Sequence, residues 1–434
     1  MPRIIDLFAG LGGIRLGFQQ AMDELGLETE CVFSSEIKPY AIKAYKGFYG
    51  EEDIYGDITQ VVTDKEIPDF DYLLAGFPCQ PFSSAGNRNG FADTRGTMFF
   101  EIERILRDKI NSKSPAKGFL LENVEGLINH DNGNTIKTII NHLKKLGYKV
   151  NYKLLDSKEF GLPQSRKRVY IVGTLDETID LEGFECKEAV LGDILEHGLP
   201  TVNTTFTKKL FANYTADEVV GKSIKDKRGG ENNIHSWDID LKGKTSKQER
   251  KLLNALLKER RKKHWADVIG IKWMDGMPLT EEQIRTFFDV PKLHTMLEHL
   301  TDMGYLVYEH PKKQVKGEDG TVKRVPDETK EKGYNIVAGK LSFEFSKILD
   351  PSDIAPTLVA MDVAKLGIVD GAGIRRLTIR ECQRLCGYPD DYNLDMVSEA
   401  EAFDLLGNTV CVPVIKEIAL RMGHSYLKNT KGGI

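Results

Sequence analysis

Short apolar runs alternate with amphipathic stretches over the first 175 residues of the chain. The runs have the length and composition of buried strands and lie at residues 3–8, 30–36, 72–75, 119–121 and 169–172. Two of the amphipathic stretches, 14–25 and 134–146, repeat apolar residues at helical spacing. They are followed by Gly26 and Gly147, which favour helix C-termini. Strands that alternate with helices predict an α/β fold with a doubly wound sheet.

The alternation stops after Gly173. Residues from about 185 to 355 are polar and loop-rich, and we expect them to form an irregular region. All three tryptophans of the chain, Trp237, Trp265 and Trp273, fall in this region. Residues 311–332 are charged and contain glycine, which predicts an exposed loop.

A basic segment lies inside this region, at residues 244–263. It contains nine lysines and arginines against two acids. A lysine-rich helix is most often a solvated face, whereas the adjoining His264 and Trp265 favour a surface that contacts phosphates. The sequence leaves both interpretations open.

Composition narrows the class of protein. The chain has 434 residues, of which 41% are hydrophobic and 29% charged, a balance typical of a soluble globular protein. No apolar run approaches the roughly 18 residues of a membrane span, and a strand begins at once, so we expect neither a membrane protein nor a signal peptide. The formal charge of −5 neither favours nor excludes a nucleic-acid partner.

The six cysteines are scattered along the chain and form no CxxC pair. We therefore expect neither a disulfide framework nor a metal site. A reducing cytoplasm is the expected location.

A glycine-rich turn follows the first strand and precedes the first helix. A turn built from Gly10, Gly12 and Gly13 in this position lets backbone N–H groups cradle a nucleotide-like ligand. Glu36 ends the next strand, where an acid can accept hydrogen bonds from ribose hydroxyls. Arg15 stands where the dinucleotide pattern has its third glycine, which leaves open an adenosine-containing cofactor without a pyrophosphate. A plain tight turn is the structural alternative.

Further strand ends carry reactive side chains. Cys79 lies between two prolines directly after a strand, where open α/β sheets place their ligands, so we expect a nucleophilic thiol rather than a buried one. Glu122 ends another strand and is expected at the same edge of the sheet, as an acid whose pKa burial would raise. Arg166 and Arg168 alternate on an extended segment, which suits them to phosphate or carbonyl oxygens.

These motifs occur in the same order as in the DNA cytosine-5 methyltransferase family, which the chain resembles. The resemblance rests on DLFAGLGG at residues 6–13, Glu36, GDI at 56–58, GFPCQPFS at 76–83, DTRG at 93–96, ENV at 122–124, QSRKR at 164–168, RRLT at 375–378, REC at 380–382 and GNTV at 407–410. It runs from about residue 3 to 420 and is interrupted only at 185–355. The PCQ and ENV motifs at this spacing are highly specific.

The resemblance implies a Rossmann-like domain that binds S-adenosyl-L-methionine (SAM) and a smaller, irregular target-recognition domain. The first is expected at residues 1–180 and 400–434, and the second at 185–395 with its variable part at about 185–355. The implied SAM site, whose product is S-adenosyl-L-homocysteine, comprises Phe8, Ala9, Gly10, Leu11, Gly12, Gly13, Ile14, Glu36, Ile37, Asp57, Ile58, Pro78, Asn408 and Thr409. DNA contacts are expected at Gln80, Ser83, Arg95, Lys258, Arg260, Arg261, Lys262 and Lys263.

The chemistry of the residues agrees with this resemblance. We expect Cys79 to attack carbon 6 of a cytosine, Glu122 to protonate or hydrogen-bond ring nitrogen 3, and Arg168 with Arg166 to hold the ring carbonyl or a phosphate. The target base must leave the duplex to be reached. The expected protein is a bacterial type II modification methyltransferase. It would act as a cytoplasmic monomer on double-stranded DNA at the nucleoid, alongside a cognate restriction endonuclease.

Two other functions are alternatives. Transfer-RNA methyltransferases similar to this family have a compact recognition region, whereas the roughly 170 residues at 185–355 favour duplex DNA as the substrate. A non-catalytic DNA-binding regulator is disfavoured because the PCQ and ENV motifs are intact. The recognised DNA sequence has no readable code in the chain.

Overall fold

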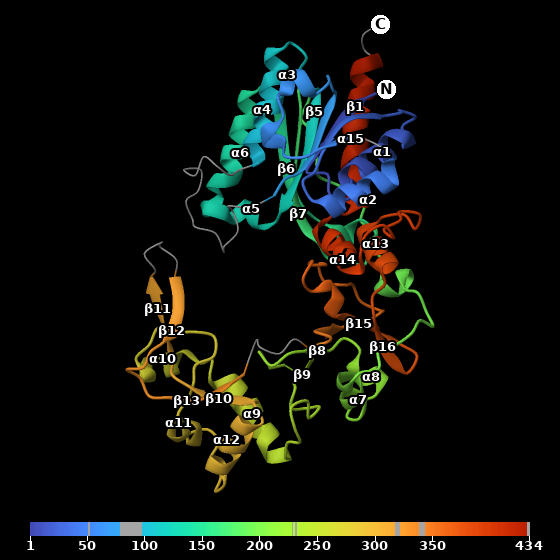
Figure 1. Cartoon of the computed structure of the whole chain (residues 1–434). Coiled ribbons are helices and arrows are strands. Elements are labelled where there is room, and N and C mark those ends of the chain that lie inside the picture. Colours follow the sequence, from blue (N-terminus) through green and yellow to red (C-terminus); the bar gives the residue numbers. More distant parts are fainter. Residues whose placement is uncertain are drawn as a thin grey trace. The chain divides into compact units, whose positions relative to one another are not determined.

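The structure is a computed structural model that describes residues 1–50, 53–78, 98–227, 229–230, 232–316, 322–337 and 343–431. Contacts divide the chain into two compact units, whose elements are labelled in Figure 1. Unit 1 comprises Met1–Glu196, Pro351–Val363 and Thr378–Ile434, and unit 2 comprises His197–Asp350 and Ala364–Leu377. Four predicted site residues, Cys79, Gln80, Ser83 and Arg95, lie outside the described residues.

Unit 1 is built on a seven-stranded sheet with the order β3-β2-β1-β4-β5-β7-β6. The strands are β1 (Arg3–Leu7), β2 (Glu30–Ser35), β3 (Ile54–Tyr55), β4 (Tyr72–Gly76), β5 (Gly118–Val124), β6 (Lys149–Asp156) and β7 (Lys167–Thr174). The first five strands of the sheet order run parallel, and β7 runs antiparallel to both neighbours. The predicted α/β doubly wound sheet is confirmed, while the reversal of β7 was not predicted.

Helices cover both faces of this sheet (Figure 1). One core contains apolar residues of α4 (Met98–Asn111) and α6 (Asn134–Lys145), and the other contains those of α1 (Gly13–Glu24) and α15 (Val412–Lys431). The predicted helices at 14–25 and 134–146 are confirmed to within a residue or two. Shorter helices complete the unit: α2 (Pro39–Tyr49), α3 (Thr63–Glu66), α5 (Gly126–Asn129), α13 (Ile379–Cys386) and α14 (Glu399–Asn408).

The C-terminal helix packs closely against the first helix. A Cβ at Gly17 of α1 would lie 2.7 Å from the carbonyl oxygen of Val412 and 2.7 Å from Cβ of Ile415. Only glycine allows this approach. This contact holds α15 against α1, the helix that connects β1 to β2. It therefore also keeps α14, which directly precedes α15 in the chain, within unit 1.

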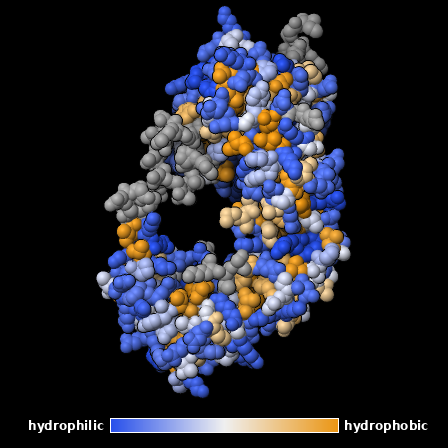
Figure 2. All heavy atoms as spheres, in the orientation of Figure 1, coloured by the Kyte–Doolittle hydropathy of each residue, from blue (hydrophilic) through white to orange (hydrophobic). Residues whose placement is uncertain are grey.

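Unit 2 contains two apolar cores. The first lies between α7 (Thr205–Phe211), α8 (Ala216–Val219) and a five-stranded sheet of β16 (Gly373–Arg376), β15 (Leu366–Asp370), β14 (Lys347–Ile348), β8 (Ser223–Ile224) and β9 (Asn233–Ile234). The second lies between α9 (Lys247–Glu259), α10 (Lys263–Ile269), α11 (Glu281–Arg285), α12 (Leu293–Asp302), β10 (Leu306–Glu309) and β13 (Gly333–Ile336). Hydrophilic side chains cover most of the visible surface, with apolar patches between them (Figure 2).

Two expectations about unit 2 need correction. Residues 185–355 are more regular than predicted, because α9 and α12 bury leucines at helical spacing in a shared core. The segment 311–332 is not a loop throughout, since β11 (Lys312–Lys316) pairs antiparallel with β12 (Val322–Pro326). Its strands, KKQVK and VKRVP, do not alternate apolar and polar residues, so the sequence carries no period-two signal for a strand there.

The contacts also place the boundaries of the units. Residues 378–395 belong to unit 1 by their contacts, whereas the sequence predicted a division between residues 395 and 400. The roles of the two units as SAM-binding and target-recognition domains stay a prediction. Within the described residues, no helix has the combined length and apolar character that crossing a membrane requires.

Candidate functional site

Unit 1 contains a cavity of about 700 Å³ at the carboxyl ends of its parallel strands. Its wall includes residues that directly follow β1, β2 and β4, the last residues of β5, and residues at the end of α14. From β1, the chain first adds β2 and β3 on one side of the sheet and then β4 and β5 on the other side. Open α/β sheets place their ligands at the point where the order changes direction in this way. The volume is typical of a small-molecule site.

The glycine turn forms part of this wall. Phe8, Gly10 and Gly12 have φ values of 56°, 56° and 69°, and Gly12 is the N-cap of α1. A Cβ at Gly10 would meet no atom of the described residues within 4 Å, so the backbone there is open to a ligand. At Gly12 a Cβ would lie 2.5 Å from the Tyr49 ring, so that glycine is required by packing.

Two tyrosine hydroxyls hold the carbonyl groups of the turn. Tyr392 donates to the carbonyl of Leu11 at 2.7 Å, and Tyr49 donates to that of Gly12 at 2.8 Å. Burial raises the pKa of both tyrosines, which keeps the hydroxyls as donors. The guanidinium of Arg15 lies 3.9 Å from the centroid of the Tyr49 ring. Arg15, where the dinucleotide pattern has glycine, therefore supports the turn from within the protein.

The carboxylate of Glu36 fixes the turn to the segment after β2. Its Oε2 accepts from the backbone N–H of Gly10 at 2.8 Å, and Oε1 accepts from those of Ile37 and Lys38 at 2.8 and 2.9 Å. A carboxylate has about four acceptor positions, so these three bonds leave Oε2 with capacity for one more. The predicted ribose acceptor thus lies at the cavity wall and also orders the wall itself.

Glu122 and Arg168 face each other at the same wall. Residue 168 of β7 is paired with Val124 of β5, because antiparallel pairing brings the start of β7 beside the end of β5. Arg168 Nε lies 3.0 Å from Glu122 Oε1. Burial raises the pKa of Glu122, and the charges of Arg168 and Arg166 reduce this rise. A buried carboxyl with a raised pKa can hold and deliver a proton.

Arg166 is buried and bonds mainly to backbone. It donates from Nη1 to the carbonyl of Leu358 at 2.9 Å and from Nη2 to that of Gly407 at 3.1 Å. Its Nε has no hydrogen-bond partner among the described residues. Arg166 lines the cavity and directly precedes β7. Its two hydrogen bonds connect the start of β7 to the backbone at Leu358 and Gly407. This geometry favours a positioning role over the predicted contact with the base.

Asn123 connects the ENV motif to the segment that leads to Cys79. Its Nδ2 donates to the carbonyl of Phe77 at 2.9 Å, and its Oδ1 accepts from the N–H of Val124 at 2.9 Å. The sequence indicated Glu122 as a site residue, whereas the contact of Asn123 was not predicted. Its position next to a strand-end acid was the available signal, because side chains alternate in direction along a strand.

A second missed group joins two parts of the cavity wall. Asp404 of α14 accepts from Lys38 Nζ at 3.0 Å and from the Tyr40 hydroxyl at 2.7 Å, and its backbone carbonyl accepts from Asn408 at 2.8 Å. Lys38 and Asn408 both line the cavity. We call Lys38, Tyr40 and Asp404 the rim cluster. No sequence pattern links residues so far apart in the chain.

The structure brings most of the predicted SAM residues together. Those that line the cavity are Phe8, Ala9, Gly10, Leu11, Gly13, Ile14, Glu36, Ile37, Pro78, Asn408 and Thr409. Asp57 is exposed and accepts from the N–H of Thr59 at 3.0 Å, and Ile58 is buried in the core beneath the sheet. Both residues lie at the start of the short helix that follows β3. Neither they nor Gly12 are among the residues that line the cavity, and their part in SAM binding stays a prediction.

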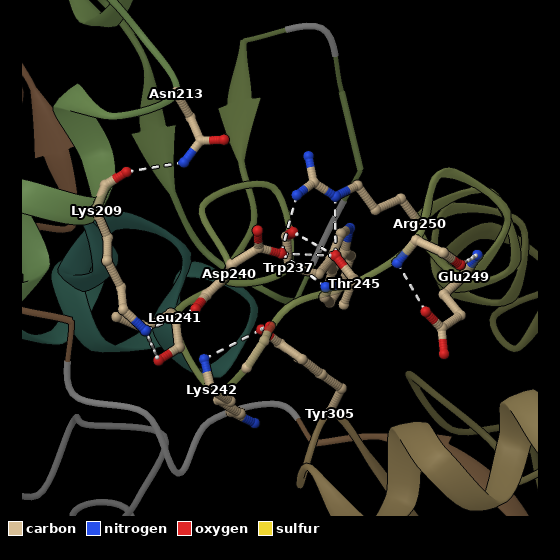
Figure 3. Close-up of polar contacts among 12 residues, drawn as sticks. Lys209, Asn213, Trp237, Asp240, Leu241, Lys242, Thr245, Glu249, Arg250 and Tyr305 are labelled. Carbon is tan, nitrogen blue, oxygen red and sulfur yellow. Dashed lines mark hydrogen bonds and ion pairs between the residues drawn. The ribbon is translucent and has the colours of Figure 1, made fainter.

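The basic segment of unit 2 uses part of its charge internally. Arg250 donates from Nη2 to Asp240 Oδ1 at 2.9 Å and from Nε to Thr245 Oγ1 at 2.8 Å (Figure 3). Figure 3 also shows Lys209 directed at the backbone of Asp240 and Leu241, with which it forms two hydrogen bonds. These contacts stabilise the loop before α9.

The predicted DNA contacts in this segment differ among themselves. Arg260 is only 3% exposed and donates from Nη1 to Asn335 Oδ1 at 2.7 Å, so it cannot belong to a solvated basic face. Burial lowers the pKa of Arg260 to about 10. Arg261 and Lys262 are paired with Asp275 and Glu259 at 2.5 and 2.6 Å. Lys258 and Lys263 are exposed.

Comparison with known proteins places the chain in a family. A model of C-5 cytosine-specific DNA methylases matches residues 2–424. Type II methyltransferase M.NlaIV of Neisseria lactamica is 54% identical over 98% of this chain and 99% of its own. M.HgiCI of Herpetosiphon aurantiacus, also a type II methyltransferase, is 44% identical over 97% of each chain. The solved structure of S. pombe Dnmt2 methyltransferase has 16% identity over 98% of this chain and 99% of that one, and its TM-score of 0.54 shows a shared fold. The chain therefore belongs to the C-5 cytosine-specific DNA methylases and is a DNA (cytosine-5-)-methyltransferase.

Proposed function

We propose that the chain transfers the methyl group of SAM to carbon 5 of a flipped-out cytosine in a specific duplex sequence, through a covalent bond to Cys79. One observation carries the proposal: a single cavity is lined by the glycine turn, by Glu122 and by Pro78, which directly precedes Cys79 in the chain. A cavity with both sets of groups in its wall suits a methyl donor and a base held side by side.

The cavity wall fits an adenosine-containing sulfonium compound. Oε2 of Glu36 retains an acceptor position for a ribose hydroxyl, and the open backbone at Gly10 leaves space for the ligand. The N-terminus of α1 favours a carboxylate such as that of the methionine portion. When bound, SAM would supply an activated methyl group and become S-adenosyl-L-homocysteine.

The chain's own residues prepare the cytosine. A bond between the Cys79 sulfur and carbon 6 converts the ring to a nucleophilic enamine when ring nitrogen 3 gains a proton. Glu122 supplies that proton, because burial raises its pKa, and Arg168 holds the carboxyl in place from 3.0 Å. After the methyl group is bound to carbon 5, a base removes the hydrogen there. The sulfur–carbon bond then breaks and releases the thiolate, and ring nitrogen 3 returns its proton to the Glu122 carboxylate.

The other cysteines of unit 1 support this choice of nucleophile. Cys382, Cys386 and Cys411 are buried, and burial raises the pKa of each thiol, that of Cys386 to about 12. A thiol with a raised pKa stays protonated and is a poor nucleophile. Cys31, which lies in β2, and the exposed Cys186 are not among the residues that line the cavity.

Unit 2 is the proposed target-recognition domain and unit 1 the proposed SAM-binding domain. Duplex DNA is the proposed substrate because the matching family model describes DNA methylases, and RNA is the alternative. The family of type II methyltransferases also supports a role in protecting host DNA from a cognate restriction enzyme. We propose that the protein acts as a monomer in the cytoplasm at the nucleoid.

A mechanism-based trap tests the proposal. Duplex DNA with 5-fluorocytosine at the target should form a SAM-dependent, denaturant-stable adduct at Cys79, because fluorine cannot leave carbon 5 as a cation. The same sequence as RNA should give no adduct. A fully active preparation that forms no adduct, or one at Cys382, Cys386 or Cys411, would contradict the mechanism.

A further inference from the structure

The hairpin β11–β12 is the most basic element of the described part of unit 2. Its ten strand residues include five cations, Lys312, Lys313, Lys316, Lys323 and Arg324, and no acid. It forms a two-stranded sheet of its own, and Gln314 is paired with Arg324 and Val315 with Lys323. An isolated two-stranded hairpin is marginally stable in water, so the element depends on what anchors its base or contacts its faces.

Charge is compensated at the base of the hairpin. Lys313 Nζ lies 3.0 Å from Asp327, and Lys312 Nζ lies 3.7 Å from Glu309. The backbone N–H of Asp327 also donates to the carbonyl of Pro311 at 2.7 Å and closes the hairpin. These contacts hold the two strands to β10 and to the segment before β13.

Further along β12 lie two cations that differ from those at the base. Lys323 and Arg324 are both exposed, and neither has an acidic partner among the described residues. They are consecutive and so project from opposite faces of the ribbon. The adjoining surface adds the exposed Lys272, whose Nζ lies 3.4 Å from Gln314 Oε1, and Trp273, which is 47% exposed.

This distribution differs from that of the basic segment 244–263. There, Arg250, Arg261 and Lys262 have acidic partners, and Arg260 is buried. Five further lysines of the segment, Lys244, Lys247, Lys251, Lys258 and Lys263, are exposed, and no acidic partner is seen for them among the described residues. The difference lies in geometry: α9 buries its leucines on one face and carries its lysines on the other, whereas the cations of β12 lie on both faces of a ribbon. A ribbon with cations on both faces is complementary to a polyanion that borders it on two sides.

We propose that the hairpin β11–β12 contacts the phosphate backbone of duplex DNA through Lys323 and Arg324. The major groove of DNA admits a two-stranded ribbon and has a phosphate chain along each side. Phosphate contacts position a protein on DNA without reading its sequence. The proposal rests on the function proposed above and adds a DNA-contacting element to it. The connection at residues 317–321 lies outside the described residues and has no part in it.

The salt dependence of binding tests the proposal in the full-length protein. The probe is a fluorescein-labelled DNA duplex of mixed sequence, and affinity is measured by anisotropy at several salt concentrations. Each phosphate contact contributes about 0.9 to the slope of log affinity against log salt. The variant K323Q/R324Q should therefore lower the magnitude of the slope by about 2 and weaken binding to all duplex sequences equally.

The matched control is K251Q/K258Q on α9, which removes two exposed lysines from the basic segment. Its slope should equal that of the parent protein. An unchanged slope in the hairpin variant would overturn the proposal, as would an equal loss in both variants, or a loss on an RNA duplex alone.

A separate readout distinguishes failure of this proposal from failure of the proposed function. The 5-fluorocytosine trap is therefore applied to the parent protein from the same preparation. If the slope is unchanged and the adduct forms, only the hairpin proposal is wrong. If the parent protein forms no adduct, the proposed mechanism is wrong whatever the slope.

Discussion

Unit 1 and unit 2 use their charged side chains in opposite ways. In unit 1, Glu36, Glu122 and Arg168 lie at the ends or starts of strands and face a common cavity. In unit 2, Arg250 and Arg260 of the basic segment bond to groups within the unit and hold its loops and helices together. The same residue types therefore serve a site in one unit and internal stability in the other.

The difference follows from how each unit is built. A parallel sheet collects its strand ends at one edge, so a polar residue at a strand end reaches the site almost regardless of its neighbours. Unit 2 consists of short helices and strands around two cores, and the direction of each side chain there depends on packing. A charged segment in such a unit therefore does not by itself indicate a binding surface, because its side chains can be bonded to groups within the unit.

The largest expected effect concerns the nucleophile of unit 1. Cys79→Ala should abolish methyl transfer to DNA, because no other thiol lines the cavity among the described residues, while SAM binding stays close to that of the parent. Cys186→Ala, which removes an exposed thiol, is the control and should keep full activity. Tritium transfer from labelled SAM to DNA measures both. Activity of the Cys79 variant above a few per cent of the parent rate would place the chemistry elsewhere.

The next effect concerns the proton donor. Glu122→Gln should lower the rate of methyl transfer by about 10²–10⁴, because an amide cannot deliver a proton to ring nitrogen 3. Since burial raises the pKa of Glu122, the parent rate should fall as pH increases through that raised pKa and the carboxyl ionises. The variant should lack this alkaline decline. A decline of the same shape in both proteins would assign it to another group.

A stability effect separates the two units. Arg260→Ala should lower the free energy of unfolding by about 1–3 kcal/mol, because a buried charged donor is removed and Asn335 loses its partner. Lys262→Ala, in the same segment but exposed, should change it by less than about 0.5 kcal/mol. Denaturant unfolding measures both. Equal values would mean that Arg260 lies on the solvated face after all.

The smallest effect concerns the rim cluster. Burial alone would raise the pKa of Asp404, but hydrogen bonds from Tyr40 and Lys38 outweigh it and lower the pKa. Its contribution is therefore present above the usual carboxylate range and is lost as pH falls through the lowered pKa. Because the pair is partly exposed, Asp404→Asn should cost at most about 1 kcal/mol, seen as a rise of about fivefold or less in the KM for SAM. An unchanged KM would remove the cluster from the site.

Much of unit 1 was predictable from the sequence. The strands at β1, β2, β4, β5 and β7 and the helices α1 and α6 have patterns of apolar residues that fit only one secondary structure. The glycine turn, Glu36 and Glu122 were predictable as site residues because their positions at strand ends determine where they lie. Their roles in binding and catalysis remain predictions.

The rest depended on contacts that the sequence does not display. The reversal of β7 explains how Arg168 meets Glu122, yet strand direction leaves no mark in a short apolar run. Asp404 reaches Lys38 across more than 360 residues. In unit 2, the burial of Arg260 and the pairing of the hairpin β11–β12 are set by tertiary packing, which the charge pattern of the sequence does not display.

One measurement tests the central claim that unit 1 performs the chemistry and unit 2 selects the DNA sequence. Residues 197–350 and 364–377 would be exchanged for the corresponding unit of a type II methyltransferase with a different target, and bisulfite sequencing would map methylated cytosines in a host that expresses the chimera. We predict methylation at carbon 5 in the sequence recognised by the donor of unit 2, with that of the parent left unmodified. A chimera that methylates the parental sequence would contradict the claim.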